Sequence, residues 1–211
     1  MIRLMIITIT LLIKTSLPAQ TVDVDAIIAK TSKTYDAWSG TLVKFTAQLL
    51  TEMNGTTESF EGTIRMKNNK FVLTTPDMTI WFDGTTQWTY MQRIEEVNIM
   101  TPSEVDLRLL NPIVLLKDYK KDFNVTCIGE STTVHAKIAY DLVFTPKKKN
   151  DIEKIEIQIE KNASLPAKLV VTMRNQLLIT VINEMNAENL SDEIFTFPAA
   201  TFPNAEIIDL R

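Results

Sequence analysis

The hydrophobic positions of this chain follow two different periods, and the first of them is helical. Apolar or small residues recur near the N-terminus at spacings of three and four, at Val24, Ile27, Ile28, Thr31, Tyr35 and Trp38. These positions form one stripe of an amphipathic helix. Asp23 precedes the stripe and is a candidate N-cap, because its carboxylate can accept from the first free amides. We therefore predict a helix over residues 23–38.

From residue 41 onward the period is two, which is typical of half-buried strands. In residues 41–52, Val43, Phe45, Ala47 and Leu49 alternate with polar residues, and Asn54-Gly55 follows as a hairpin signal. Comparable strand-like segments are residues 60–67, 70–75, 78–91 (a hairpin around Asp83-Gly84), 95–100, 123–130, 137–146, 152–160, 166–173, 177–190 and 193–198. About ten or eleven strands at regular spacing predict a large antiparallel sheet or barrel. Neither a repeat nor a linker interrupts them, so we predict a single domain over residues 20–211.

The segment from Ser103 to Tyr119 is apolar but does not read as a strand. Thr101 and Glu104 fit a capping box with Pro102 at the first helical position, and Pro112 predicts that this helix ends near residue 110. A second short helix is expected over residues 113–117. Two interpretations remain open: a movable lid over the mouth of a barrel, or a buried helix that caps an ordinary core.

The first nineteen residues predict a cleaved signal peptide. Arg3 provides a basic start, residues 4–13 are apolar, and cleavage is expected after Ala19. An uncleaved anchor helix is the alternative, but ten apolar-rich residues are short for a bilayer. Cys127 is the only cysteine, so the exported chain has no internal disulfide and no acylated N-terminal cysteine.

Composition excludes several classes of function. The net charge is −4, from 22 basic and 26 acidic residues, without a basic stripe for nucleic acid. His135 is the sole histidine, five glycines form no phosphate loop, and no nucleophile motif is present. We therefore expect no enzyme, metal or cofactor. A hydrolase with unrecognised carboxylates is a minor alternative. The basic stretch 146–151 is expected to be a charged hairpin loop, with a docking patch for an acidic partner as the alternative.

Residues 60–99 carry a resemblance to a known family. They contain Gly62-Thr63-Ile64, Lys67, Lys70-Phe71, Pro76, Asp83-Gly84, Trp88, Tyr90 and Val97 in order, followed by Asn111-Pro112, Leu115-Leu116, Phe195-Thr196-Phe197, Pro203 and Ile207-Ile208-Asp209. In this pattern the chain resembles the periplasmic outer-membrane lipoprotein carrier family, LolA, from about Tyr35 to its end. One departure is Asn68, where the family commonly has arginine that ties the lid shut; Arg65 or Lys67 are the candidate substitutes.

The resemblance implies a mainly β fold with some α: an incomplete, strongly curved antiparallel β-barrel closed by short helices. It also implies an apolar cavity for acyl chains under a lid that Pro112 breaks. Nine methionines and nine phenylalanines suit such a soft cavity, although a plain core explains most of them. The residues expected to line cavity and lid are Phe45, Leu49, Ile64, Met66, Phe71, Leu73, Ile80, Phe82, Trp88, Leu110, Ile113, Val114 and Leu116.

The function that the resemblance implies is that of a soluble carrier in the periplasm. Such a carrier shields the acyl chains of lipoproteins and moves them from the inner to the outer membrane. The implied partners are lipidated proteins, an inner-membrane lipoprotein-releasing transporter and an outer-membrane acceptor, and the carrier is expected to be a monomer. The alternative is a lipid-binding sensor or an envelope regulatory module of the same fold.

Overall fold

The computed structural model describes residues 22–51, 55–103, 107 and 112–211 of the chain. The predicted signal peptide, residues 1–19, lies outside the described residues. So does the first helix of the predicted lid, apart from its start at residues 101–103 and Leu107, which is helical and half-buried.

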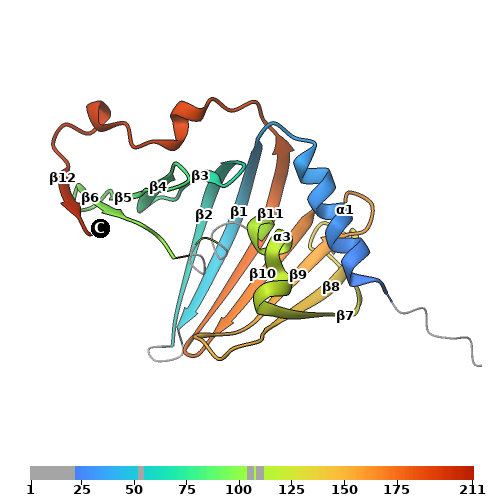
Figure 1. Ribbon diagram of the computed structural model, residues 1–211. Helices are drawn as coiled ribbons and strands as arrows, with labels where there is room; N and C mark the ends of the chain where they lie inside the picture. The colour runs from blue at the N-terminus through green and yellow to red at the C-terminus, as the bar shows by residue number, and fades with distance from the viewer. Residues whose placement is uncertain (1–21, 52–54, 104–106, 108–111) are drawn as a thin grey trace, which may run out of the picture.

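Twelve strands in the described residues form one sheet in the order β12-β6-β5-β4-β3-β2-β1-β11-β10-β9-β8-β7. All neighbours are antiparallel except β12 and β6, which are parallel. The sheet is not closed into a barrel but curls, so that the short strands β3–β6 bend away from the long strands of the other half (Figure 1). The strands are β1 Thr41–Thr51, β2 Thr56–Lys67, β3 Lys70–Thr74, β4 Met78–Phe82, β5 Gln87–Met91, β6 Glu96–Met100, β7 Phe123–Thr132, β8 Ile138–Pro146, β9 Ile152–Glu160, β10 Pro166–Met173, β11 Gln176–Ala187 and β12 Glu206–Asp209.

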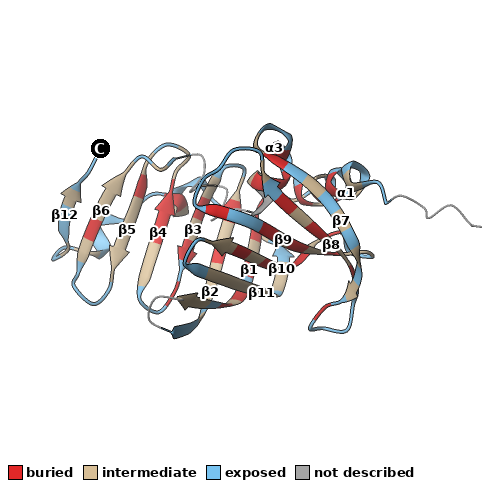
Figure 2. Cartoon of the chain, turned by 90° about the horizontal axis from the view of Figure 1, so that it is seen from below, coloured by how far each residue is buried: buried red, intermediate tan, exposed pale blue. Residues whose placement is uncertain are grey.

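The core lies on the concave face of this sheet. In β1, Val43, Phe45 and Ala47 are buried, while Lys44 and Gln48 on the other face are exposed, as the period of two predicts. In β9, Ile155, Ile157 and Ile159 repeat the pattern. Figure 2 shows buried positions alternating along the strands. The alternation arises in strands that bury one face in the core and expose the other to solvent.

Two helices lie on one side of the sheet, in front of its β8–β10 part (Figure 1). Helix α1, Val24–Asp36, confirms the helix predicted over residues 23–38, and the carboxylate of Asp23 accepts from the amide of Ala26 at 3.0 Å as its N-cap. Helix α3, Pro112–Asp122, is longer than the predicted residues 113–117 and has non-helical dihedral angles at Asp118. No helix within the described residues is long and apolar enough to span a bilayer.

The segment after β11 differs from the prediction. Residues 193–198 were expected to form a strand, but the chain forms two short 3₁₀ helices, η1 Asp192–Phe195 and η2 Ala199–Thr201. The reason is that its aromatic residues pack against the outer face of β4 and β5 instead of pairing at a sheet edge. The ring centroids of Phe197 and Phe202 lie 5.4 and 5.9 Å from that of Trp81. The segment therefore crosses above β3–β5 before β12 joins the sheet (Figure 1).

Candidate functional site: an apolar cavity and a polar pocket

An apolar cavity of about 300 Å³ lies on the concave face of the sheet. Its walls come from β1–β4 on one side and β10–β11 on the other. Among the described lining residues, Thr75 and Thr180 are the only ones with a side-chain hydroxyl. A cavity of this size and lining can take flexible hydrocarbon but offers few groups for directional recognition. The lining residues are Val43, Phe45, Ala47, Leu49, Phe60, Ile64, Met66, Leu73, Thr75, Met78, Pro166, Leu169, Leu178, Thr180, Ile182 and Met185.

Five of the residues expected from the sequence line this cavity: Phe45, Leu49, Ile64, Met66 and Leu73. They share the concave face of β1, β2 and β3, the strands in which the alternation is clearest.

Three further candidates, Phe71, Ile80 and Phe82, are buried in the core beside the cavity and are not among its lining residues. The rings of Phe71 and Phe82 lie 5.4 Å apart and fill the space where β3 and β4 meet. The structure places Trp88 on the other face of the sheet. Trp88 is the cross-strand partner of Trp81, whose ring packs against the C-terminal segment.

The lid candidates lie in or near α3. Val114 is half-buried, and Leu116 is only 1% exposed in the hydrophobic core that also includes Leu115 and Phe144. None of these side chains lines the apolar cavity, and Leu115 and Leu116 are part of the hydrophobic core. Leu110 and the side chain of Ile113 lie outside the described residues.

Sequence reasoning missed the β10–β11 wall. A bulge hides part of this wall from a reading of the alternation. The register passes from Lys44 opposite Glu184 to Phe45 opposite Ile182, which leaves Asn183 as an extra residue. Ile182 and Met185 therefore both face the cavity, although they are three positions apart and would face opposite sides in a regular strand. The alternation at Leu178 and Thr180 was a signal that could have been used.

Two ion pairs and one tyrosine hydrogen bond join α3 to α1. Lys117 contacts Asp36 at 2.5 Å, and Lys120 contacts Asp25 at 2.6 Å. The buried Tyr119 also donates its hydroxyl to Asp25. These hydrogen bonds, that of Lys120 first, lower the pKa of Asp25, whereas burial and the nearby carboxylate raise the pKa of Tyr119. The acidic residues of α1 thus hold α3 in place.

The candidate substitutes for the family's lid arginine hold a different element. Arg65 contacts Glu188 at 3.2 Å. Lys67 donates to the carbonyl of Leu190 at 2.9 Å and contacts Asp192 at 2.8 Å, beside Lys70. These lysines lower the pKa of Asp192 to about 2. In this structure the basic side chains of β2 and β3 therefore fasten the segment that follows β11.

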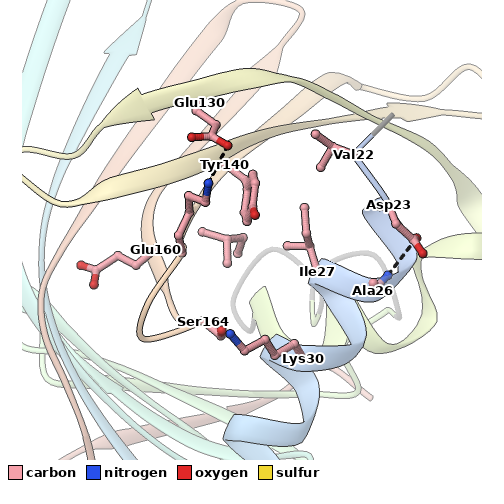
Figure 3. A pocket seen from close by; sticks show the side chains of 11 residues that line it. Val22, Asp23, Ala26, Ile27, Lys30, Glu130, Tyr140, Glu160 and Ser164 are labelled. Atoms are coloured by element: carbon pink, nitrogen blue, oxygen red, sulfur yellow. Dashed lines mark hydrogen bonds and ion pairs between the residues drawn. The ribbon is translucent and has the colours of Figure 1, made fainter. Parts of the chain in front are cut away.

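A second, more polar pocket of about 560 Å³ lies between the start of α1 and the ends of β7–β9 (Figure 3). Apolar and charged groups line it together. Its lining residues are Val22, Asp23, Ala26, Ile27, Lys30, Glu130, Tyr140, Ile159, Glu160, Lys161 and Ser164.

Groups for catalysis or metal binding are sparse. Within the described residues, no three histidine, cysteine, aspartate or glutamate side chains are placed to hold a metal ion. His135 is exposed, with Nε2 3.3 Å from the carbonyl oxygen of Ile182, and half-buried Cys127 donates to the carbonyl of Gly129 at 3.4 Å.

Comparison with known proteins gives a family and a fold. The family model described as outer membrane lipoprotein carrier protein LolA matches residues 21–175. No curated protein matches the chain. Among solved structures, an uncharacterized conserved protein from Thermus thermophilus is similar, with a TM-score of 0.56 and 13% identity over 87% of this chain and 97% of that one. A LolA superfamily protein from Nitrosomonas europaea has a TM-score of 0.47 and 12% identity over 83% of this chain and 98% of that one.

Proposed function

The chain belongs to the LolA family of outer membrane lipoprotein carrier proteins, and from this premise we propose that it is a carrier that encloses the acyl chains of lipidated proteins in its apolar cavity. The observation that carries the proposal is the cavity itself, about 300 Å³ on the concave face, in which two of the described lining residues bear a hydroxyl and the others are apolar.

The physical basis of such binding is the removal of methylenes from water. Each buried CH₂ contributes about 0.8 kcal/mol, and this contribution has no preferred direction. The cavity lining includes Met66, Met78 and Met185, whose unbranched side chains adapt to chains of different shape. A long acyl chain is thus held firmly without specific contacts, and its release requires an acceptor that offers a competing apolar site.

The finer parts of the proposal concern place and direction. We propose that residues 1–19 are removed on export, that residues 20–211 act as one domain in the periplasm, and that cargo passes from the inner to the outer membrane. The donor would be a lipoprotein-releasing transporter of the inner membrane, and the recipient an acceptor on the outer membrane. Support for these parts comes from family membership and from the signal-like N-terminal sequence.

A titration with a fluorescent acylated peptide tests the carrier proposal. Leu178 lines the cavity, whereas Ile179 is the next residue on β11, equally half-buried but on the opposite face. Leu178→Asp should lower the affinity at least tenfold, and Ile179→Asp, the matched control, should leave it within twofold, once both variants are shown to be folded. Equal affinities in both variants would remove the cavity from the mechanism.

Transfer separates a carrier from a sensor of the same fold. The loaded protein should give up its acylated peptide to acceptor vesicles or to an outer-membrane fraction within minutes. Saturable acyl-dependent binding without any transfer would instead favour the lipid-binding sensor.

A further inference from the structure

We propose that the polar pocket between α1 and the ends of β7–β9 is a second subsite, which holds the polypeptide next to the acylated residue of the cargo. This inference deepens the proposed carrier function and depends on it. It assigns separate places to the two halves of one amphiphilic ligand: hydrocarbon in the apolar cavity and peptide backbone in the polar pocket.

The two cavities are neighbours on the same face of the sheet. Ile159 on β9 lines the polar pocket, and its cross-strand partner Pro166 on β10 lines the apolar cavity. Directly paired residues of adjacent antiparallel strands point to the same face. Ser164, in the turn between these two strands, lines the polar pocket only two residues before Pro166. A ligand that leaves the apolar cavity across this pair enters the polar pocket.

The pocket offers hydrogen-bond donors that no other described group uses. Ser164 is only 4% exposed, yet within the described part of the chain its hydroxyl has no hydrogen-bond partner. The ammonium of Lys30 likewise has no partner there, and in Figure 3 the Lys30 side chain points toward Ser164. An unpaired hydroxyl that faces a cavity is free to donate a hydrogen bond to an acceptor on a ligand. Peptide carbonyl oxygens are acceptors of the required kind.

The charges of the lining argue against an anionic headgroup. Asp23, Glu130 and Glu160 face Lys30 and Lys161, so the formal charge of the lining is three negative against two positive, or −1. Glu130 is already neutralised by Lys161 at 2.7 Å, and Glu160 points away from the centre of the pocket in Figure 3. The charges that remain, Asp23 and Lys30, cancel, so the lining offers no excess positive charge for a phosphate, whereas an uncharged peptide backbone needs none.

The apolar part of the pocket gives the backbone a surface to lie on. Ile27 projects from α1 into the pocket, and the ring of Tyr140 lies opposite, with the ammonium of Lys161 4.8 Å from its centroid. The cation keeps that ring in place. Donors at one end and an apolar surface at the other suit a short extended peptide with small side chains.

Peptide length is the variable that tests the inference. Palmitoylated Gly-Ser peptides of one, three and six residues, each with the same C-terminal fluorophore, are compared with the palmitoylated fluorophore alone. Affinity for the protein should rise about tenfold between the palmitoylated fluorophore and the three-residue peptide, and little beyond that. An affinity independent of peptide length overturns the peptide subsite while leaving the carrier proposal intact. Absence of any acyl-dependent binding overturns both.

Two substitutions locate the effect in this pocket. Lys30→Ala and Ser164→Ala should each remove most of the gain due to peptide, about three- to tenfold, because a hydrogen bond to a charged or buried group is lost. Neither should change the affinity for the palmitoylated fluorophore. Lys33→Ala is the matched control, since Lys33 is exposed on the same helix and does not line the pocket.

The remaining outcomes also decide the question. Loss of affinity for both probes in Lys30→Ala would show that Lys30 supports the apolar cavity and not a peptide subsite. Tighter binding of an anionic phospholipid than of the palmitoylated three-residue peptide, lost in the same variant, would replace the peptide by a headgroup.

Discussion

The ring of Phe45 occupies the space that a side chain at Gly62 would need. The two residues are cross-strand partners on β1 and β2, and a Cβ built on Gly62 would lie 2.3 Å from the Cζ atom of Phe45. Glycine at this position therefore lets Phe45 lie flat against β2. It also keeps the ring in the wall of the apolar cavity, where its centroid is 6.4 Å from that of Phe60 in an edge-on contact.

Gly62→Ala should push the Phe45 ring into the cavity. We expect a loss of about 1–3 kcal/mol in the free energy of unfolding, the usual result of overpacking, and a severalfold weaker binding of acylated peptide. Urea denaturation and the fluorescence titration measure the two effects. Adding Phe45→Leu should restore part of both; a double variant as weak as Gly62→Ala alone would contradict the steric explanation.

The variant Leu116→Ala tests whether Leu116 acts as a core residue or as part of a lid over the ligand. Leu116 is 1% exposed in the core and does not line the apolar cavity. Its truncation should lower the free energy of unfolding by about 2–5 kcal/mol and leave the affinity for acylated peptide unchanged under conditions where the protein is folded. If affinity falls in the folded variant, α3 contacts the ligand in another conformation, and the lid interpretation returns.

The contacts between α3 and α1 should control how often α3 opens. Asp25→Ala removes the acceptor of both Tyr119 and Lys120, so amide hydrogens of α3 should exchange faster, as measured by hydrogen–deuterium exchange. Tyr119→Phe should act in the same direction. Asp77→Ala, which breaks the exposed ion pair with Arg93 elsewhere on the sheet, is the control and should not alter α3. Unchanged exchange in both Asp25→Ala and Tyr119→Phe would show that these contacts do not limit the opening of α3.

The fastening of the C-terminal segment should weaken in acid. Lys67 and Lys70 lower the pKa of Asp192 from 3.8 to about 2. Because the folded pKa is the lower one, the stabilisation is complete above the unfolded pKa and is lost as the pH falls from 3.8 toward 2. The difference in melting temperature between the natural protein and Asp192→Asn should therefore narrow across that window in calorimetry. A difference that stays constant from pH 6 to pH 2 would contradict the assignment.

Local patterns in the sequence were sufficient to predict an element and its buried side chains wherever only one face of the element is buried. The stripe from Val24 to Trp38 predicted α1, and the alternation in residues 41–52 predicted which side chains of β1 are buried. The hairpin around Asp83-Gly84 was also predicted. There the Asp83 carboxylate accepts from the amides of Thr85 and Thr86, both at 2.8 Å, and Gly84 has a φ of 104°. These features depend on neighbours in the sequence.

The sequence could not reveal the inward face where both faces are covered. In β4, Ile80 and Phe82 face the core while Trp81 packs under the C-terminal segment, so all three are buried and the alternation disappears. Trp88, the partner of Trp81, was consequently assigned to the wrong face.

By itself, then, the sequence determined a strand-rich chain with an N-terminal helix, an apolar concave face and membership of a carrier family. Only the tertiary structure decided that β1 pairs with β11, a strand far away in the chain. It decided as well that, through the bulge at Asn183, Ile182 and Met185 both point into the same cavity. It also decided that Ile159 and Pro166 join an apolar cavity to a polar pocket. The physical reason is that long-range pairing and a one-residue shift in register change which side chains share a face, while leaving every local pattern unaltered.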